Sequence, residues 1–154
     1  MKLERDELAT EARAFVESVL ESALLDLKVE IGNSENGIKL DISGEDKGLL
    51  LADNARLLYA LNHLVNQIYY RKSVDGCNFM LDSNNYREDR ATELELMAEK
   101  AAEKVRLSGM KVSMQPMPSS ERRIIHLALA EIKDVETLSE GSGRYRRVLI
   151  VPAD

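Results

Sequence analysis

The segment SSERRIIHLALA, residues 119–130, holds the side chains best suited to chemistry in this 154-residue sequence. On a helix, Arg122 and His126 lie four positions apart and therefore share a face. A guanidinium presents a planar fork of donors to a phosphate, and an imidazole adds a second donor or a flat ring beside it. The pair therefore suits the backbone of a nucleic acid.

Spacing alone favours a structural alternative, because pairs of Arg and His four residues apart are common. In this alternative Arg122 forms an ion pair with Glu121 or Glu136. His126 is then a hydrogen-bonded residue at the edge of its domain. Either hypothesis needs a buried side of the helix, which the pattern assigns to Ile124, Ile125, Leu127 and Leu129.

The remaining reactive side chains predict no metal site, no cofactor and no enzyme. His63 and His126 are the only histidines, and neither has a Cys, Asp or second His at the spacing of metal ligands. The sequence has no GxxxxGK(S/T) phosphate loop, and GSG at 141–143 lacks the pattern of a nucleophile elbow. Cys77, the single cysteine, is expected to be a small buried hydrophobe in a reducing compartment.

Charge is distributed unevenly along the chain. The formal net charge of −6 at pH 7 argues, on its own, against a nucleic-acid partner. Residues 1–83 contain 9 Lys and Arg against 15 Asp and Glu, whereas the rest of the chain has 12 of each class. From Lys104 onward there are 9 basic and 6 acidic residues, a local net charge of +3. This asymmetry indicates a polyanion partner for the second half, although charge clusters are more often solvated faces.

Hydrophobic periodicity predicts six elements in the first 84 residues. Helical spacing over 8–25 is followed by strict alternation, which indicates a hairpin with Asn36-Gly37 in its turn. Helical spacing returns over 47–71, but Asp53 and Asn54 favour caps over helix interiors, so two helices should meet at 52–55. The expected order is α-β-β-α-α-β, with strands at 27–31, 38–42 and 78–82.

The rest of the chain predicts a second unit of order α-β-α-β-β. A long charged helix begins it and ends before Gly109. The fold class is therefore α+β, in two units at 1–84 and 85–154. No stretch is apolar enough for a membrane span or a signal peptide, so a cytoplasmic protein is expected. The elements of the second unit are helices at 87–107 and 119–132 and strands at 112–114, 135–138 and 145–151.

Arg122-x-x-x-His126 followed by VETLSEGSGRYRRVLIVP resembles the R-x-x-x-H (R-3-H) domain of single-stranded nucleic-acid-binding proteins. With SGEDKGLL and NYRE upstream, the chain from Leu8 to Pro152 resembles the bacterial Jag family. The resemblance implies a type II KH domain at 1–84 and an R-x-x-x-H domain at 85–154. It also implies that the family's further N-terminal Jag domain is missing, because only a few residues precede the first helix.

The resemblance implies that Arg122 and His126 contact phosphate or base. On a strand, Arg146 and Arg147 would point to opposite sides, so one of the two is expected to be structural. Ser139 and Gly141 match the family's loop between the last strands, where a hydroxyl or a backbone amide could add a contact. The basic surround implied by the resemblance consists of Arg123, Arg144, Arg146 and Arg147.

Two departures from the family pattern bear on function. KH domains hold nucleotides against a Gly-x-x-Gly loop, where glycine lets the backbone approach closely. That position reads Ala52-Asp53-Asn54-Ala55, which places two methyl groups and one negative charge there, so this degenerate loop is expected to have lost nucleic-acid binding. Pro118-Ser119-Ser120 replaces the family's Asn-Pro-Tyr, which removes one aromatic platform for a base.

The sequence therefore predicts a protein without catalytic activity that binds single-stranded RNA or DNA, with RNA favoured, through its second unit. The alternative is a protein-interaction adaptor or dimerisation module in which nucleic-acid binding is vestigial. The resemblance permits a homodimer or a second KH protein as partner of the first unit. It also permits association with a membrane insertase of the YidC type.

Overall fold

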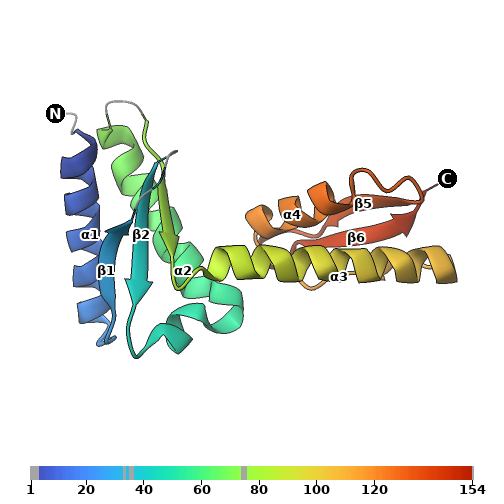
Figure 1. Ribbon diagram of the computed structural model, residues 1–154, viewed down its shortest axis with the longest axis horizontal. Helices are drawn as coiled ribbons and strands as arrows, with labels where there is room; N and C mark the ends of the chain where they lie inside the picture. Colours follow the sequence, from blue (N-terminus) through green and yellow to red (C-terminus); the bar gives the residue numbers. More distant parts are fainter. Residues whose placement is uncertain (1–3, 33, 35–36, 74–75, 154) are drawn as a thin grey trace. The chain divides into compact units, whose positions relative to one another are not determined.

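A computed structural model describes residues 4–32, 34, 37–73 and 76–153. The chain folds as two compact units, Met1–Tyr86 and Arg87–Asp154, each with helices on a three-stranded sheet (Figure 1). The α+β class and the order of elements in both units are as the sequence predicts. Within the described ranges, no helix is both long and apolar enough to cross a membrane.

The first unit places two long helices on one face of its sheet. The central strand β2 runs antiparallel to β1 and parallel to β3. Leu40 on β2 pairs with Ile31 on β1 and Leu81 on β3. Leu40 and Leu81 are buried in the core that the helices cover, whereas Ile31 on the edge strand is 46% exposed. Asn36 of the expected hairpin turn lies outside the described residues. The elements are α1 (Arg5–Ser22), β1 (Lys28–Gly32), β2 (Ile38–Ser43), α2 (Lys47–Tyr69), a 3-10 turn (Tyr70–Lys72) and β3 (Phe79–Asp82).

The helical segment α2 is broken where the sequence predicts two helices to meet. Ala52 is extended, and Asp53, Asn54 and Ala55 all have left-handed backbone angles, with φ of 53°, 57° and 55°. The left-handed run turns the chain sharply between two helical stretches. It does so without glycine, the residue that adopts this conformation at least cost.

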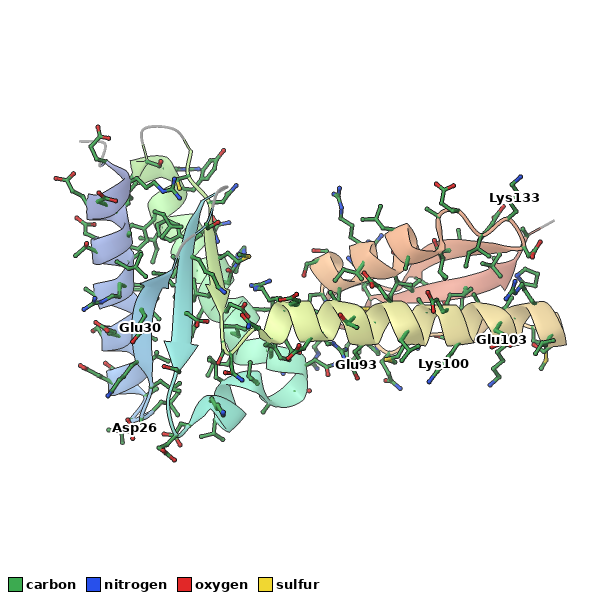
Figure 2. All side chains as sticks on the ribbon, in the orientation of Figure 1. Asp26, Glu30, Glu93, Lys100, Glu103 and Lys133 are labelled. Carbon is green, nitrogen blue, oxygen red and sulfur yellow. The ribbon has the colours of Figure 1, made fainter. Side chains whose placement is uncertain are left out.

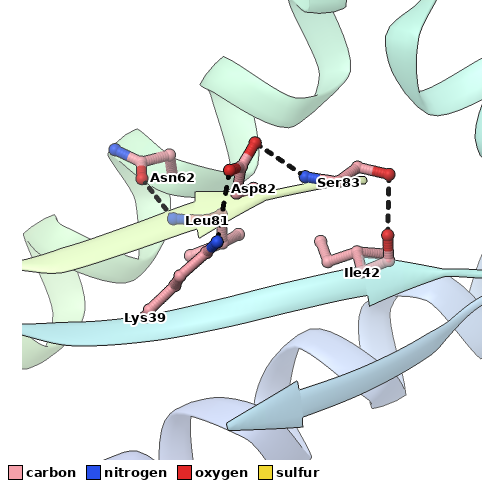
Figure 3. Close-up of polar contacts among 6 residues, drawn as sticks. All are labelled: Lys39, Ile42, Asn62, Leu81, Asp82 and Ser83. Carbon is pink, nitrogen blue, oxygen red and sulfur yellow. Dashed lines mark hydrogen bonds and ion pairs between the residues drawn. The ribbon is translucent and has the colours of Figure 1, made fainter. Parts of the chain in front are cut away.

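Two asparagines of α2 satisfy the free edge of β3. Since β3 pairs with β2 on one side only, its outer backbone groups need other partners. The Leu81 N–H donates to Asn62 Oδ1 at 2.8 Å (Figure 3), and the Phe79 N–H donates to Asn66 Oδ1 at 2.9 Å. Beyond the strand, Ser83 Oγ donates to the Ile42 carbonyl at 2.7 Å. The strand is thereby fixed to both α2 and β2.

The second unit is an antiparallel sheet of order β4-β6-β5 with both of its helices on one face. Ala98 of α3, Ile125 of α4 and Ile150 of β6 meet in its buried core. Charged side chains such as Glu93, Lys100 and Glu103 project from the opposite side of α3 (Figure 2). The elements are α3 (Tyr86–Ser108), β4 (Val112–Ser113), α4 (Ser119–Leu129), β5 (Val135–Glu140), a 3-10 turn (Gly143–Tyr145) and β6 (Arg147–Pro152).

Candidate nucleic-acid interface

The position of the buried face of α4 determines how exposed the polar residues of this helix are. Ile125 and Leu129 are buried, which leaves Arg122 and His126 half-buried on the flank and Arg123 exposed. The sequence assigned Leu127 to the buried side, and this is wrong. Leu127 is 63% exposed, because it lies about 160° around the helix axis from Ile125 and Leu129 lies only about 40° away.

Glu121 is tied to α3 rather than to its neighbour in sequence. Its carboxylate is 1% exposed and lies 3.3 Å from Nη2 of Arg90. The second nitrogen of the same guanidinium, Nη1, contacts Glu93 at 2.7 Å. The structural alternative in which Arg122 pairs with Glu121 is therefore not the arrangement found. Among the described residues, no hydrogen bond or ion pair of the Arg122 guanidinium is found, which leaves its donors available to a ligand.

His126 joins α4 to β5 through both of its ring nitrogens. Nδ1 lies 2.6 Å from Thr137 Oγ1, and Nε2 lies 3.0 Å from Ser139 Oγ. Burial lowers the pKa of the His126 imidazole below its usual value, and the positive charge of Arg122 lowers that pKa further. The neutral ring therefore predominates at pH 7. A neutral imidazole offers one donor and one acceptor, and the two hydroxyls can supply the complementary roles.

Thr137 and Ser139 alternate with outward residues on β5, so both face α4. The sequence placed Ser139 in the loop after the strand, but β5 extends to Glu140 and Ser139 pairs with Val148 across the ladder. Ser139 is nevertheless exposed, because β5 is an edge strand. Its hydroxyl is thus held by His126 and remains open to solvent.

The turn between β5 and β6 carries two exposed arginines, and a third begins β6. Gly141 has a φ of 87°, and a Cβ there would come within 3.0 Å of the Tyr145 carbonyl oxygen. Glycine is therefore needed to close this turn, a role that sequence reasoning did not assign to it. Arg146 precedes β6 and Arg147 is the first residue of β6; both are exposed, so burial does not single out one of them as a structural residue. Arg144 is exposed as well.

Tyr145 is the residue of this turn that sequence reasoning missed. Its side chain is 64% exposed. The Arg144 guanidinium lies 4.9 Å from the ring centre, and Arg144 Nη2 donates to the phenolic oxygen at 2.7 Å. The signal was present in the motif YRRV, where an aromatic residue stands among arginines.

A backbone hydrogen bond brings the turn to the beginning of α4. The Met117 N–H donates to the Arg146 carbonyl at 3.1 Å, two residues before α4 starts at Ser119. Arg122 lies in the first turns of that helix. Arg122 and the arginine-bearing turn therefore gather at one end of the second unit. Together with Ser139 and His126 they form what we call the arginine end, defined by Arg122, His126, Ser139, Arg144, Tyr145, Arg146 and Arg147.

The degenerate loop of the first unit presents a carboxylate rather than an open backbone. Asp53 and Arg56 form an exposed ion pair at 3.6 Å. Of the two methyl groups that we expected at the surface, only that of Ala52 is exposed, because Ala55 is fully buried. The exposed groups of this loop are therefore the ion pair of Asp53 with Arg56 and the side chain of Ala52.

Among the residues that the structure describes, no group of three or more His, Cys, Asp or Glu is placed to hold a metal ion. Cys77 is a free cysteine that is half-buried against the core of the first unit. The expectation of a small hydrophobe at this position is thus only partly met.

Comparison with known proteins identifies the domain family of the second unit. Residues 92–152 match the R-3-H domain, which agrees with the fold and with the arrangement of Arg122 and His126. RNA-binding protein KhpB of Clostridium symbiosum is 35% identical over 148 residues, which cover 95% of this chain and 67% of that protein. The chain therefore belongs to the KhpB family, in agreement with the predicted relationship to Jag proteins.

Two further relatives have the same name. RNA-binding protein KhpB of Bacillus subtilis is 30% identical over 142 residues, covering 91% of this chain and 68% of that protein. RNA-binding protein KhpB of Lactiplantibacillus plantarum is 36% identical over 125 residues, covering 81% of this chain but only 38% of that protein. The chain thus spans about two thirds of some relatives and well under half of others.

Proposed function

We propose that this protein binds single-stranded RNA at the arginine end of its second unit. The observation that carries the proposal is the Arg122 guanidinium, whose donors are not committed to any described residue. It lies at the same end of the unit as three exposed arginines, two in the turn before β6 and one at the start of β6. Its relatives are named as RNA-binding proteins, which favours RNA over DNA. The proposal requires no catalytic step, and the unpaired Cys77 suits the reducing cytoplasm.

In this proposal Arg122 donates to a phosphate of the strand. His126 is a positioning residue, because its two ring nitrogens already bond Thr137 and Ser139. It holds the Ser139 hydroxyl at the edge of the site, where that hydroxyl can bond a phosphate or a 2′-hydroxyl. The exposed arginines of the turn extend the positive surface along the strand.

The first unit takes no part in phosphate binding at its degenerate loop. Asp53 is exposed there, and its charge opposes that of a phosphate. The unit also carries the whole net charge of −6. We assign the strand to the second unit on these two grounds.

The test is an anisotropy titration of a labelled single-stranded RNA at several salt concentrations. Arg122→Ala should weaken binding about tenfold or more, because a hydrogen bond to a charged group contributes roughly 1.5–3 kcal/mol. It should also make the slope of log K against log salt shallower by about 0.7. Arg106→Ala is the matched control: Arg106 is exposed in the last turn of α3, and its loss changes the net charge equally. We expect that control to stay within about twofold of the wild type.

If the wild type does not bind RNA at low salt, the RNA-binding proposal is wrong and a protein-interaction adaptor becomes the favoured function. Equal effects of Arg122→Ala and Arg106→Ala would mean that net charge, rather than the arginine end, governs binding.

A further inference from the structure

We propose that Tyr145 is a stacking platform for an unpaired base, so that the arginine end reads a base as well as phosphates. This inference rests on the proposed function and adds a base subsite to it. Tyr145 is the only Phe, Tyr or Trp between residues 87 and 154. Any base that stacks on such a ring in the second unit must therefore use Tyr145.

The ring is exposed in a way that suits stacking. A large aromatic side chain that is 64% exposed gains little from its own fold and has apolar surface left to cover. Arg144 lies 4.9 Å from the ring centre and so covers one face of the ring. The other face is the one available to a base. Stacking of a base there would complete a layered arrangement of base, phenol and guanidinium.

The ring is also held in place before any ligand arrives. Arg144 Nη2 donates to the phenolic oxygen at 2.7 Å, which restricts rotation of both side chains. The backbone beneath is a 3-10 turn, in which the Tyr145 N–H donates to the Ser142 carbonyl at 3.1 Å. The close approach of Gly141 to the Tyr145 carbonyl closes the same turn. Binding therefore requires little further ordering, which favours affinity.

The neighbouring charges define the ligand. Arg146 and Arg147 follow Tyr145 directly and are exposed, so a base on the ring would have its flanking phosphates within a positive surface. A duplex keeps its bases stacked on one another and cannot offer a free face. The ligand class is therefore a single strand, and the preference among bases should be weak, because every base has a π-face.

The sequence suggested that a stacking aromatic was missing, since Pro118-Ser119-Ser120 replaces the family's Asn-Pro-Tyr. Tyr145, in the turn before β6, is an aromatic residue that can take its place at the arginine end. The Met117 N–H bonds to the carbonyl of Arg146, the residue that follows Tyr145. The turn that carries Tyr145 thus lies next to the segment from which the expected aromatic is absent.

The experiment compares Tyr145→Ala, Tyr145→Leu and Tyr145→Phe with the wild type, using the full chain and a single-stranded RNA containing 2-aminopurine. Stacking quenches 2-aminopurine fluorescence. We expect quenching with the wild type and Tyr145→Phe, and little with Tyr145→Ala or Tyr145→Leu. Affinity should fall roughly 5- to 150-fold in Tyr145→Ala, with the salt slope unchanged, because stacking transfers no counterions. Tyr145→Phe, which keeps the ring, should stay within about threefold of the wild type.

A backbone-only probe separates this inference from the proposed function. An RNA whose bases are replaced by abasic sites should bind the wild type and Tyr145→Ala equally. If the wild type binds RNA with a steep salt dependence but Tyr145→Ala binds and quenches as the wild type does, the stacking inference is wrong and the phosphate site stands. If the wild type does not bind RNA at low salt, or if Arg122→Ala weakens binding no more than Arg106→Ala does, the proposed function fails first. Urea unfolding of each variant shows whether a lost signal reflects lost folding.

Discussion

The protonation of His126 is linked to the stability of the second unit. Its ring bonds two hydroxyls of β5, and its pKa is lowered by burial and by the charge of Arg122. A lowered histidine pKa means that the folded state binds its proton less readily than the unfolded chain does. Folding is then favoured above the ordinary histidine pKa of about 6.5 and is progressively weakened as pH falls below it.

We therefore expect the free energy of unfolding of the wild type to decrease as pH falls from 7.5 to 5.5. In His126→Asn the histidine contribution to this decrease should be absent. The variant loses the hydroxyl contacts, at about 1 kcal/mol each, so its deficit against the wild type should be largest at pH 7.5 and shrink toward pH 5.5. Urea unfolding monitored by circular dichroism measures the free energy of unfolding of the wild type and of His126→Asn at each pH. The control is His63→Asn, which alters an exposed histidine. A deficit that is constant or grows on acidification would contradict this assignment.

The residues of the site differ in how far the sequence could predict them. Arg122 and His126 share a helix, so their common face follows from spacing alone. The hydroxyls that hold His126 are 11 and 13 residues away, and they meet the ring only through the register of β5 under α4. Tyr145 could have been suggested by its arginine neighbours, but its exposure depends on how the turn closes. Local spacing is visible in a sequence, whereas contacts between elements are not.

At the scale of elements, α3 and α4 are joined by a buried ion pair. Glu121 is 1% exposed and Arg90 13%, and their closest atoms are 3.3 Å apart. Removing Arg90 takes a cationic partner away from the Glu121 carboxylate in a region shielded from water. Replacing both by apolar residues of similar size removes the penalty as well as the attraction.

Arg90→Met should therefore lower the free energy of unfolding by about 3–5 kcal/mol, whereas Arg90→Met combined with Glu121→Leu should recover most of that loss. The exposed pair of Arg106 and Asp134, at 3.8 Å, provides the matched control. Arg106→Met should cost less than about 1 kcal/mol. Urea unfolding of the wild type, Arg90→Met, the double variant and Arg106→Met measures these free energies. If the double variant were no more stable than Arg90→Met, the loss in Arg90→Met would not come from the buried charge of Glu121, and this assignment would be wrong.

The order of elements was predictable, but several of their junctions were not. Alternation and helical spacing are properties of contiguous segments, so all the helices and strands were found, with ends shifted by a few residues. The break in α2 was also predicted, because Asp53 and Asn54 interrupt the apolar stripe. Its left-handed backbone was not, since no glycine marks it. The asparagine bonds to β3 were invisible for a different reason, because they depend on where α2 lies against the sheet edge.

At the scale of the whole molecule, charge and core are both divided between the two units. Residues 1–86 carry the entire net charge of −6, and the second unit is neutral overall with its basic residues concentrated toward the end of the chain. The described buried residues form two clusters without a common member. A defect in one core should therefore leave the other unit folded.

Leu40 and Ile150 allow this independence to be tested, because both are fully buried, one in each core. Leu40→Ala and Ile150→Ala should each cost about 2–5 kcal/mol through the cavity they leave. Hydrogen exchange followed by mass spectrometry, in urea just below the wild-type transition, should show faster exchange in peptides of residues 1–86 for Leu40→Ala only. RNA affinity under the same conditions should be retained in Leu40→Ala and lost in Ile150→Ala, because the arginine end lies in the second unit. If Leu40→Ala weakened binding as much as Ile150→Ala, the RNA site would have to include the first unit despite its negative charge.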